Sequence, residues 1–298
     1  LWREVEEGNQ QYMWNGSRYY VVPGFKLYNG VYYNKDMFDE AGETYPTELF
    51  DKGEWDWDKM LELAQTLTLD SNRDGTPEQY GLGTDEPEHL LYTTGKHFIT
   101  FMPDGTARNN IQSPEVARAV AYNQKMIQSG TLVPANGRQA FGEGSVAMCI
   151  GHRWYSNGYA KLIKTDSVGF VPLPRDPDAD QYYTELEGGG IFIPKGAPNK
   201  EGAIAALHTF RYTMLSDEYR RSLYERDIEN GYWTEELQKE MEKNALCDAG
   251  VLRNWEGFGM GDHYSDIYSR PSSGEPWETI AAELAPKIDA KIKELYEA

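Results

Sequence analysis

The sequence has few of the basic side chains that polyanion binding requires. Lysine and arginine number 29 against 48 aspartates and glutamates, which gives a net charge of −19. Nucleic acid and anionic membrane surfaces attract concentrated positive charge, so neither is expected as a partner. The sequence also lacks any run approaching the roughly 18 apolar residues that a transmembrane helix needs. The acidic residues are spread along the chain and predict a solubilising surface.

Cysteine and histidine are also scarce. The two cysteines, Cys149 and Cys247, neither require nor exclude a disulfide. Cys149 lies in an apolar stretch, which is typical of a small buried side chain. The five histidines show no metal-ligand spacing, and each is expected to be an ordinary surface or core residue: His89, His97, His152, His208 and His263.

The usual catalytic and phosphate-binding motifs are absent. The sequence has no GxSxG elbow, no GxxxxGK(S/T) loop, no GxGxxG after a predicted strand and no HExxH. Among 48 acidic residues some pair can always be nominated for glycoside hydrolysis, so the abundance of acids carries little information. We therefore expect a binding protein rather than an enzyme.

Aromatic residues, by contrast, are abundant. They make up 13% of the chain, with 21 tyrosines and 8 tryptophans. Ligand pockets combine an apolar lining with a few placed polar groups, and a sugar presents apolar C–H faces edged by hydroxyls. The candidates for such a site, chosen by their place at strand ends and in loops, are Tyr28, Trp154, Tyr155, Glu187 and Trp255, with Arg153 as a polar partner.

The stretch FGEGSVAMCIGHRWY, residues 141–155, is the most informative part of the sequence. Its apolar run over 145–150, bounded by glycines, predicts a short strand that is buried on both faces. We expect the strand to stop at Gly151. Ligands in open α/β sheets bind beyond the carboxyl ends of strands. The residues that follow are therefore expected to form one wall of a site: His152, Arg153, Trp154 and Tyr155.

Predicted strands and helices alternate along the chain, which indicates the α/β class. Strands are expected over 18–23, 27–34, 145–150, 168–172 and 191–194. Helices are expected over 36–42 and after the N-cap residues Asp56, Ser113, Asn199, Ser216 and Thr234. An apolar stripe near the C-terminus predicts a further helix, bent or broken at Pro286.

A loop after the Asp56 helix resembles the front half of a calcium-binding loop. Oxygen-bearing side chains stand at positions one, three and five, with a glycine at position six. Position twelve is Gly81, so the usual bidentate glutamate is missing. The alternative is a loop of Asx turns that holds no metal. The candidate ligands of a structural calcium ion are Asp70, Asn72, Asp74, Thr76 and Glu78.

Four segments together resemble the extracellular solute-binding proteins of ABC importers, in particular the sugar-binding group that includes maltose-binding protein. The segment over 141–155 looks like the group's F-x-x-G-x-x-A-M strand, which ends in a glycine and a tryptophan. The loop DSNRDGTPEQYGL also recurs in the group. The four segments are VYYNKDMFDEAG (31–42), WDWDKMLELAQTLT (55–68), FGEGSVAMCIGHRWY (141–155), and VGFVPLP (168–174) followed by EGGGIFIPKGAPNKEGAIAAL (187–207).

The resemblance implies two α/β lobes joined by crossing segments, with the ligand in the cleft between them and lobe closure as the signal to the importer. Residues 1–28 and 187–225 would belong to lobe 1, and residues 29–186 and 226–298 to lobe 2. Members of the group carry further residues upstream, after an export signal or lipoprotein cysteine that this sequence does not show. Lobe 1 is therefore expected to be incomplete here.

The resemblance also implies a function: a bacterial, extracytoplasmic and monomeric protein that passes a carbohydrate to the transmembrane subunits of an importer. The carbohydrate is expected to be an oligosaccharide, and the protein is expected in the periplasm or at the cell surface as a lipoprotein. Trp154 or Tyr155 takes the place of the group's stacking aromatic. Trp255 is either a second stacking platform or a packing residue. Glu187 and Tyr28 lie at the two crossovers, where ligand and hinge roles overlap.

Three alternatives stay open at this stage. A protein of the same fold for a non-sugar solute would have a cleft rich in charge and poor in aromatics. A carbohydrate-active enzyme would need two carboxylates facing each other across a cleft. An interaction module would bind no small solute.

Overall fold

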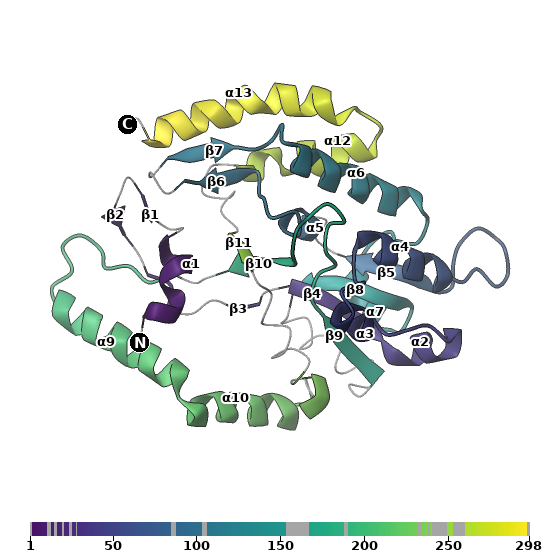
Figure 1. Ribbon diagram of the computed structural model, residues 1–298, viewed down its shortest axis with the longest axis horizontal. Helices are drawn as coiled ribbons and strands as arrows, with labels where there is room; N and C mark the ends of the chain where they lie inside the picture. The colour runs from purple at the N-terminus through teal and green to yellow at the C-terminus, as the bar shows by residue number, and fades with distance from the viewer. Residues whose placement is uncertain are drawn as a thin grey trace.

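The chain is built around one four-stranded sheet in the computed structural model (Figure 1). The structure describes residues 2–10, 13–14, 17–19, 21–23, 26–27, 29–84, 88–102, 106–152, 167–187, 190–231, 234–237, 239, 249–252 and 260–296.

The main sheet has the order β5-β8-β4-β9. Its strands are β5 (Tyr80–Thr84), β8 (Val146–His152), β4 (Asn29–Asn34) and β9 (Val168–Val171). β5 and β8 are parallel, and β4 is antiparallel to both β8 and β9. Every residue of β4, β8 and β9 is buried. The α/β class and the buried strand over 145–150 are thereby confirmed.

Side chains of β4 alternate between two apolar clusters on the two faces of the sheet. Val31 and Tyr33 join the larger cluster, which the surrounding helices complete. Tyr32 joins the smaller one, where its ring lies 4.8 Å from that of Phe170 and 6.3 Å from that of Phe141, measured between centroids. Cys149 of β8 is buried in the same smaller cluster, as predicted.

The helices begin where the sequence predicts, because a side-chain oxygen of each N-cap residue accepts a backbone N–H three residues later. The N–H···O distances are 2.9 Å for Asp56, 3.3 Å for Ser113, 2.8 Å for Asn199 and 3.2 Å for Ser216. The helices that follow are α4 (Trp57–Thr66), α6 (Pro114–Gln128), α9 (Lys200–Leu215) and α10 (Asp217–Glu229). The predicted helix over 36–42 is α2 (Lys35–Ala41), and Gly42 ends it with φ of 70°.

The remaining elements are short or lie near the ends of the chain. The helices are η1 (Arg3–Val5), α1 (Glu6–Gln10), α3 (Pro46–Asp51), α5 (His89–Tyr92), α7 (Gly137–Gly142), η5 (Met260–His263), α12 (Tyr264–Ser272) and α13 (Trp277–Tyr296). The strands form the antiparallel pairs β1 (Met13–Trp14) with β2 (Ser17–Arg18) and β6 (Ile99–Phe101) with β7 (Ala107–Asn109).

A second sheet connects the main sheet to the rest of the chain. It has the order β11-β10-β3, from β11 (Ala249–Leu252), β10 (Tyr183–Glu187) and β3 (Lys26–Leu27). β10 is parallel to β11 and antiparallel to β3. In Figure 1 this sheet lies between the main sheet and helices α9 and α10.

Two of the predicted strands are wrong. No continuous strand forms over 18–23 in the described residues, because Arg18 closes a hairpin with Met13 and Val21 makes only an isolated bridge to Ile191. The strand predicted over 191–194 does not form either, since that bridge is its only pairing among the described residues. The strand that forms nearby is instead β10, which pairs with β11, a partner 66 residues away along the chain at Tyr183↔Ala249.

The predicted end of β8 is wrong, and the C-terminal helix is not broken at Pro286. β8 does not stop at Gly151 but runs on to His152, because Gly151 pairs with Gly30 and His152 with Asn29 in β4. The C-terminal helix α13 is one uninterrupted helix across Pro286. Its stripe at Ile280, Leu284 and Ile288 is buried in the larger cluster, and this packing outweighs the hydrogen bond that proline removes.

Helix α9 leaves much of its apolar surface uncovered. Phe210 and Ile204 are each 46% exposed, and Arg211 is its one buried residue. Figure 1 shows α9 and α10 apart from the main sheet, at the lower left. The apolar core of the described residues therefore lies around the main sheet rather than around these helices.

Gly30 of β4 packs closely against β9. A Cβ atom at this position would lie 2.2 Å from Phe170 Cζ and 2.6 Å from the carbonyl oxygen of Val171. We expect Gly30→Ala to lower the free energy of unfolding by about 1–3 kcal/mol, the usual result of overpacking a core. Urea denaturation measures the loss. A free energy of unfolding equal to that of the wild type would show that the two strands can separate at no cost.

Candidate functional site

Most of the residues predicted to bind a ligand lie outside the described residues: Tyr28, Arg153, Trp154, Tyr155 and Trp255. Glu187 is the last residue of β10, where its backbone pairs with Lys26 of β3. The roles of all six residues stay predictions.

The strand register nevertheless brings the chain on either side of these residues together. Leu186 of β10 pairs with Leu27 on one side and with Leu252 on the other. Asn29, the next described residue after Leu27, pairs with His152 at the end of β8. The described residues that flank the predicted ligand residues therefore lie close together. We call this region the crossover junction (residues 26–29 without Tyr28, 152, 185–187 and 252).

A buried group of four polar side chains, which we call the Asn29 cluster, lies at this junction: Asn29, His89, His152 and Glu185. Asn29, His89 and Glu185 are 0% exposed, and His152 is 3% exposed. They come from the start of β4, the start of α5, the end of β8 and the middle of β10. Four elements that are distant in the sequence therefore meet at a buried group of polar side chains.

Hydrogen bonds link the four members of the Asn29 cluster. Asn29 Nδ2 lies 2.8 Å from His89 Nδ1 and also donates to Glu185 Oε2. His152 Nδ1 lies 2.7 Å from Asn29 Oδ1. His89 Nδ1 lies 3.3 Å from Glu185 Oε2, and the two imidazole rings meet edge to face, 5.0 Å apart between centroids. The two histidines are thus core residues, as the sequence predicts.

Sequence reasoning missed Asn29, His89 and Glu185 as partners. A weak signal was present, because Asn29 and Glu185 interrupt strand-forming segments, and a buried polar group must find a partner. Which partner it finds depends on the strand register and on the position of α5, and neither can be read from local sequence.

The calcium interpretation of the loop over 70–78 gains no support from the structure. The described residues contain no group of three or more His, Cys, Asp or Glu side chains placed to hold a metal ion. The predicted ligands instead accept backbone N–H groups of the loop itself. Asn72 accepts from Asp74 N and Asp74 from Thr76 N, both at 2.8 Å.

The two ends of the loop are bonded in the same way. Asp70 Oδ2 accepts from Gly75 N at 3.0 Å, and Glu78 Oε2 accepts from Ser71 N at 2.8 Å. Asn72 and Asp74 thus each form an Asx turn, while Asp70 and Glu78 bond across the loop.

These internal hydrogen bonds predict a loop that keeps its conformation without a cation. We expect an excess of EDTA to change the melting temperature by less than about 1 °C, because a ligand that does not bind the native state cannot stabilise it. Differential scanning fluorimetry with and without added Ca²⁺ measures this. A clear fall with EDTA that Ca²⁺ reverses would restore the calcium interpretation.

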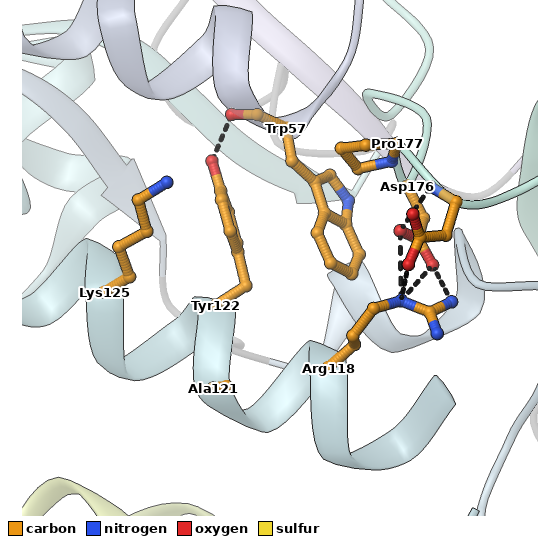
Figure 2. Close-up of a pocket in the computed structure, with 8 residues that line it drawn as sticks. Trp57, Arg118, Ala121, Tyr122, Lys125, Asp176 and Pro177 are labelled. Carbon is orange, nitrogen blue, oxygen red and sulfur yellow. Dashed lines mark hydrogen bonds and ion pairs between the residues drawn. The ribbon is translucent and has the colours of Figure 1, made fainter. Parts of the chain in front are cut away.

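A pocket of about 290 Å³ lies where α6 meets the start of α4 and the segment over 176–178. Figure 2 shows the ring of Trp57 facing that of Tyr122, with Arg118 beyond it. The two rings are stacked with centroids 4.7 Å apart, and the Tyr122 hydroxyl donates to the Trp57 carbonyl oxygen. Trp57 is 3% exposed and Tyr122 is 6% exposed, so their faces are already used in packing.

The charged groups of this pocket are also paired with one another. Arg118 donates to both carboxylate oxygens of Asp176 (Figure 2). Its Nε also lies 3.3 Å from Asp178 Oδ2. Its hydrogen bond to Asp176 raises the pKa of Arg118, and burial raises the pKa of the Tyr122 hydroxyl. The Arg118–Asp176 ion pair therefore attaches α6 to the chain after β9. Because these two charges bond each other, they are not available to a ligand.

A wider pocket, of about 720 Å³, lies between α6, α12 and the end of β5. Its lining is apolar at Ile127, Leu132 and Val133 and carries hydroxyls at Thr84, Tyr268 and Ser269. Among the helices of the described residues, none combines the length and the apolar character that crossing a membrane requires.

The fold is similar to that of solved solute-binding proteins. The TM-score is 0.67 to the ABC substrate-binding protein Lmo0181 of Listeria monocytogenes in complex with cycloalternan, with 19% identity over 96% of this chain and 75% of that one. It is 0.65 to the maltose/maltodextrin-binding domain MalE of Bdellovibrio bacteriovorus bound to maltotriose, with 16% identity over 98% of this chain and 79% of that one. It is 0.66 to UgpB of Mycobacterium tuberculosis in complex with glycerophosphocholine, with 15% identity over 97% and 75%.

At these low identities the likeness shows the fold alone, which has two α/β lobes. About a quarter of the first neighbour has no counterpart in this chain. No sequence among curated proteins matches. The family of bacterial extracellular solute-binding proteins matches residues 2–210, well over half of the chain. That match includes β3, β4, β8 and β10 at the crossover junction, and the chain therefore belongs to the bacterial extracellular solute-binding protein family.

Proposed function

We propose that the protein is the extracytoplasmic binding component of an ABC importer and that it captures a carbohydrate in the cleft between its lobes. The crossover junction is the observation that carries the proposal. The described residues that flank the predicted ligand residues pair with one another there. Two tryptophans, two tyrosines, an arginine and a glutamate suit a sugar, whose C–H faces stack on rings and whose hydroxyls need polar partners.

The structural neighbours support a carbohydrate but do not require one. Cycloalternan and maltotriose are the ligands of two of them, while the third holds glycerophosphocholine. A non-sugar solute is therefore the main rival. The ligand residues proposed for a carbohydrate remain Tyr28, Arg153, Trp154, Tyr155, Glu187 and Trp255.

We assign residues 29–186 and 226–298 to lobe 2, and 1–28 with 187–225 to lobe 1. Packing of α13 against β7 and α6 favours placing the C-terminal helices with the main sheet. A bond from Trp2 Nε1 to His208 Nδ1, 3.1 Å long, joins the first residues to α9 and favours one lobe for both.

The remaining parts of the proposal follow from the family. The protein would act as a monomer in the periplasm or at the cell surface, deliver its ligand to the transmembrane subunits and turn nothing over. Incubation with oligosaccharides is expected to release no reducing ends. Any sustained release by the purified protein would favour the carbohydrate-active enzyme instead.

A thermal-shift screen identifies the class of ligand. The panel contains maltotriose, a cyclic glucose tetrasaccharide, monosaccharides and polyols in one arm, and glycerophosphocholine, polyamines and peptides in the other. A ligand at a hundredfold excess over its Kd stabilises the native state by about 2.7 kcal/mol, which raises the melting temperature by roughly 5 °C or more. We expect such a rise in the carbohydrate arm. A rise confined to the other arm would overturn the carbohydrate assignment.

A further inference from the structure

The Asn29 cluster is more polar than stability alone explains. Burying a polar group costs free energy that its hydrogen bonds only offset, and well-packed apolar replacements of such groups are often neutral or stabilising. Yet Asn29, His89 and Glu185 are fully buried, at the point where β4, β8, β10 and α5 meet. A reason for polar side chains in this place must come from geometry.

The side-chain amide of Asn29 takes part in the hydrogen bonds to all three other members of the cluster. An amide nitrogen only donates and an amide oxygen only accepts. Asn29 Nδ2 therefore donates to His89 Nδ1 and to Glu185 Oε2, and Asn29 Oδ1 accepts from His152 Nδ1. All the hydrogen-bonding groups of the Asn29 amide that face the cluster are used, each toward a different structural element.

The neighbouring strand pair explains why such a connection is needed. Beside the Asn29↔His152 pair lies the pair Gly30↔Gly151. Glycines bring no side chain to fix a strand register and add backbone freedom. At this end of the main sheet, directional hydrogen bonds therefore take the place of interlocking apolar side chains.

We propose that Asn29 is a positioning residue of the ligand cleft. Its amide holds the start of β4, the end of β8, the middle of β10 and the start of α5 as one rigid unit, and ligand affinity depends on this unit. This inference rests on the proposed function, because Tyr28 directly precedes Asn29 in the chain, Arg153 directly follows His152, and Glu187 comes shortly after Glu185.

Isosteric substitutions test the hydrogen bonding without changing the volume of the buried side chains. Asn29→Asp removes both N–H donors and sets a carboxylate against Glu185. Glu185→Gln keeps an oxygen that accepts from Asn29 and supplies the second half of the double variant. The double variant N29D/E185Q lets the new amide donate to the new carboxylate, so it should recover much of what N29D loses. If N29D does not fold, Asn29→Ala removes all three bonds without adding a charge.

Leu63→Ala is the matched control. Leu63 is 1% exposed in α4, within the same apolar cluster as Val31 of β4, but it is not part of the crossover junction. Its truncation should lower the melting temperature without affecting the Asn29 cluster. It separates a general loss of stability from a loss of positioning.

Hydrogen exchange by mass spectrometry gives a readout that needs no ligand. We expect N29D to speed amide exchange about tenfold in β4, β8, β10 and α5 together, and N29D/E185Q to stay near the wild type. With maltotriose, or with the panel member that shifts the melting temperature most, Kd should rise about tenfold in N29D and recover in the double variant. L63A should change neither.

The exchange data test whether Asn29 holds the four elements as one rigid unit, and the Kd values test whether that unit affects ligand binding. Exchange that rises only in β4, or equally in L63A, would overturn the rigid unit. Coupled exchange with an unchanged Kd in N29D would overturn its role in ligand binding. If no panel member binds the wild-type protein, the proposed function fails, while the exchange data still decide whether Asn29 holds the four elements together.

Discussion

Alanine in place of the stacking aromatic should weaken carbohydrate binding by roughly 10- to 100-fold, or about 1.4–2.8 kcal/mol, as expected for a binding hot spot. The sequence leaves two candidates for this role, Trp154 and Tyr155. Only the residue whose ring lies against the sugar should show the full effect. Titration calorimetry of Trp154→Ala and Tyr155→Ala against the best ligand from the screen measures the two losses separately.

Tyr212→Ala is the control for these two variants. Tyr212 is an aromatic residue of α9 that is 72% exposed and remote in sequence from the predicted ligand residues. Its truncation should leave Kd within about twofold of the wild type, as for most surface substitutions. If both cleft variants also bind as the wild type does, neither residue stacks on the ligand and the site assignment over 153–155 is wrong.

The second large effect is expected at the ion pair of Arg118 and Asp176. The Asp176 side chain is 0% exposed, while that of Arg118 is 32% exposed. Arg118→Ala leaves a buried carboxylate without its cation, which costs about 3–5 kcal/mol in a fully buried pair. Because water reaches Arg118, we expect the lower part of that range, about 3 kcal/mol. Urea denaturation of the variant measures the loss.

Two further variants identify the cause of that loss. Lys125→Ala, on the same helix, removes an exposed pair with Asp58 and should cost no more than about 1 kcal/mol. The double variant R118M/D176L replaces the buried pair by apolar side chains and should recover most of the stability that R118A loses. A double variant less stable than R118A would show that the attraction between Arg118 and Asp176 itself stabilises the fold. The cost of an unpaired Asp176 carboxylate would then not explain the loss in R118A.

The helix starts could be predicted because they depend on local chemistry. The side chains of Asp56, Ser113 and Asn199 each bond a backbone N–H within three residues, so the short sequence around them contains all the information. The Asx-turn loop over 70–78 is local in the same sense. Its residue pattern fitted both a cation site and a self-bonded loop, and its side chains bond backbone N–H groups of the same loop.

The crossover junction could not be predicted, because its contacts are not local. β10 pairs with β3 and with β11, and the Asn29 cluster joins residues 29, 89, 152 and 185. No short window of sequence contains two of these partners. The strand predicted over 191–194 was wrong for the same reason: an apolar tripeptide resembles a strand, but only pairing with another strand makes it one.

The central claim is that a carbohydrate binds in the cleft at the crossover junction, and calorimetric titration of the wild-type protein tests it most directly. We expect saturable binding of one carbohydrate molecule per chain, with a negative heat-capacity change from burial of apolar surface. We also expect the affinity to fall when the stacking aromatic or Asn29 is replaced. Saturable binding of glycerophosphocholine or a polyamine, with no heat from any carbohydrate in the panel, would contradict the central claim.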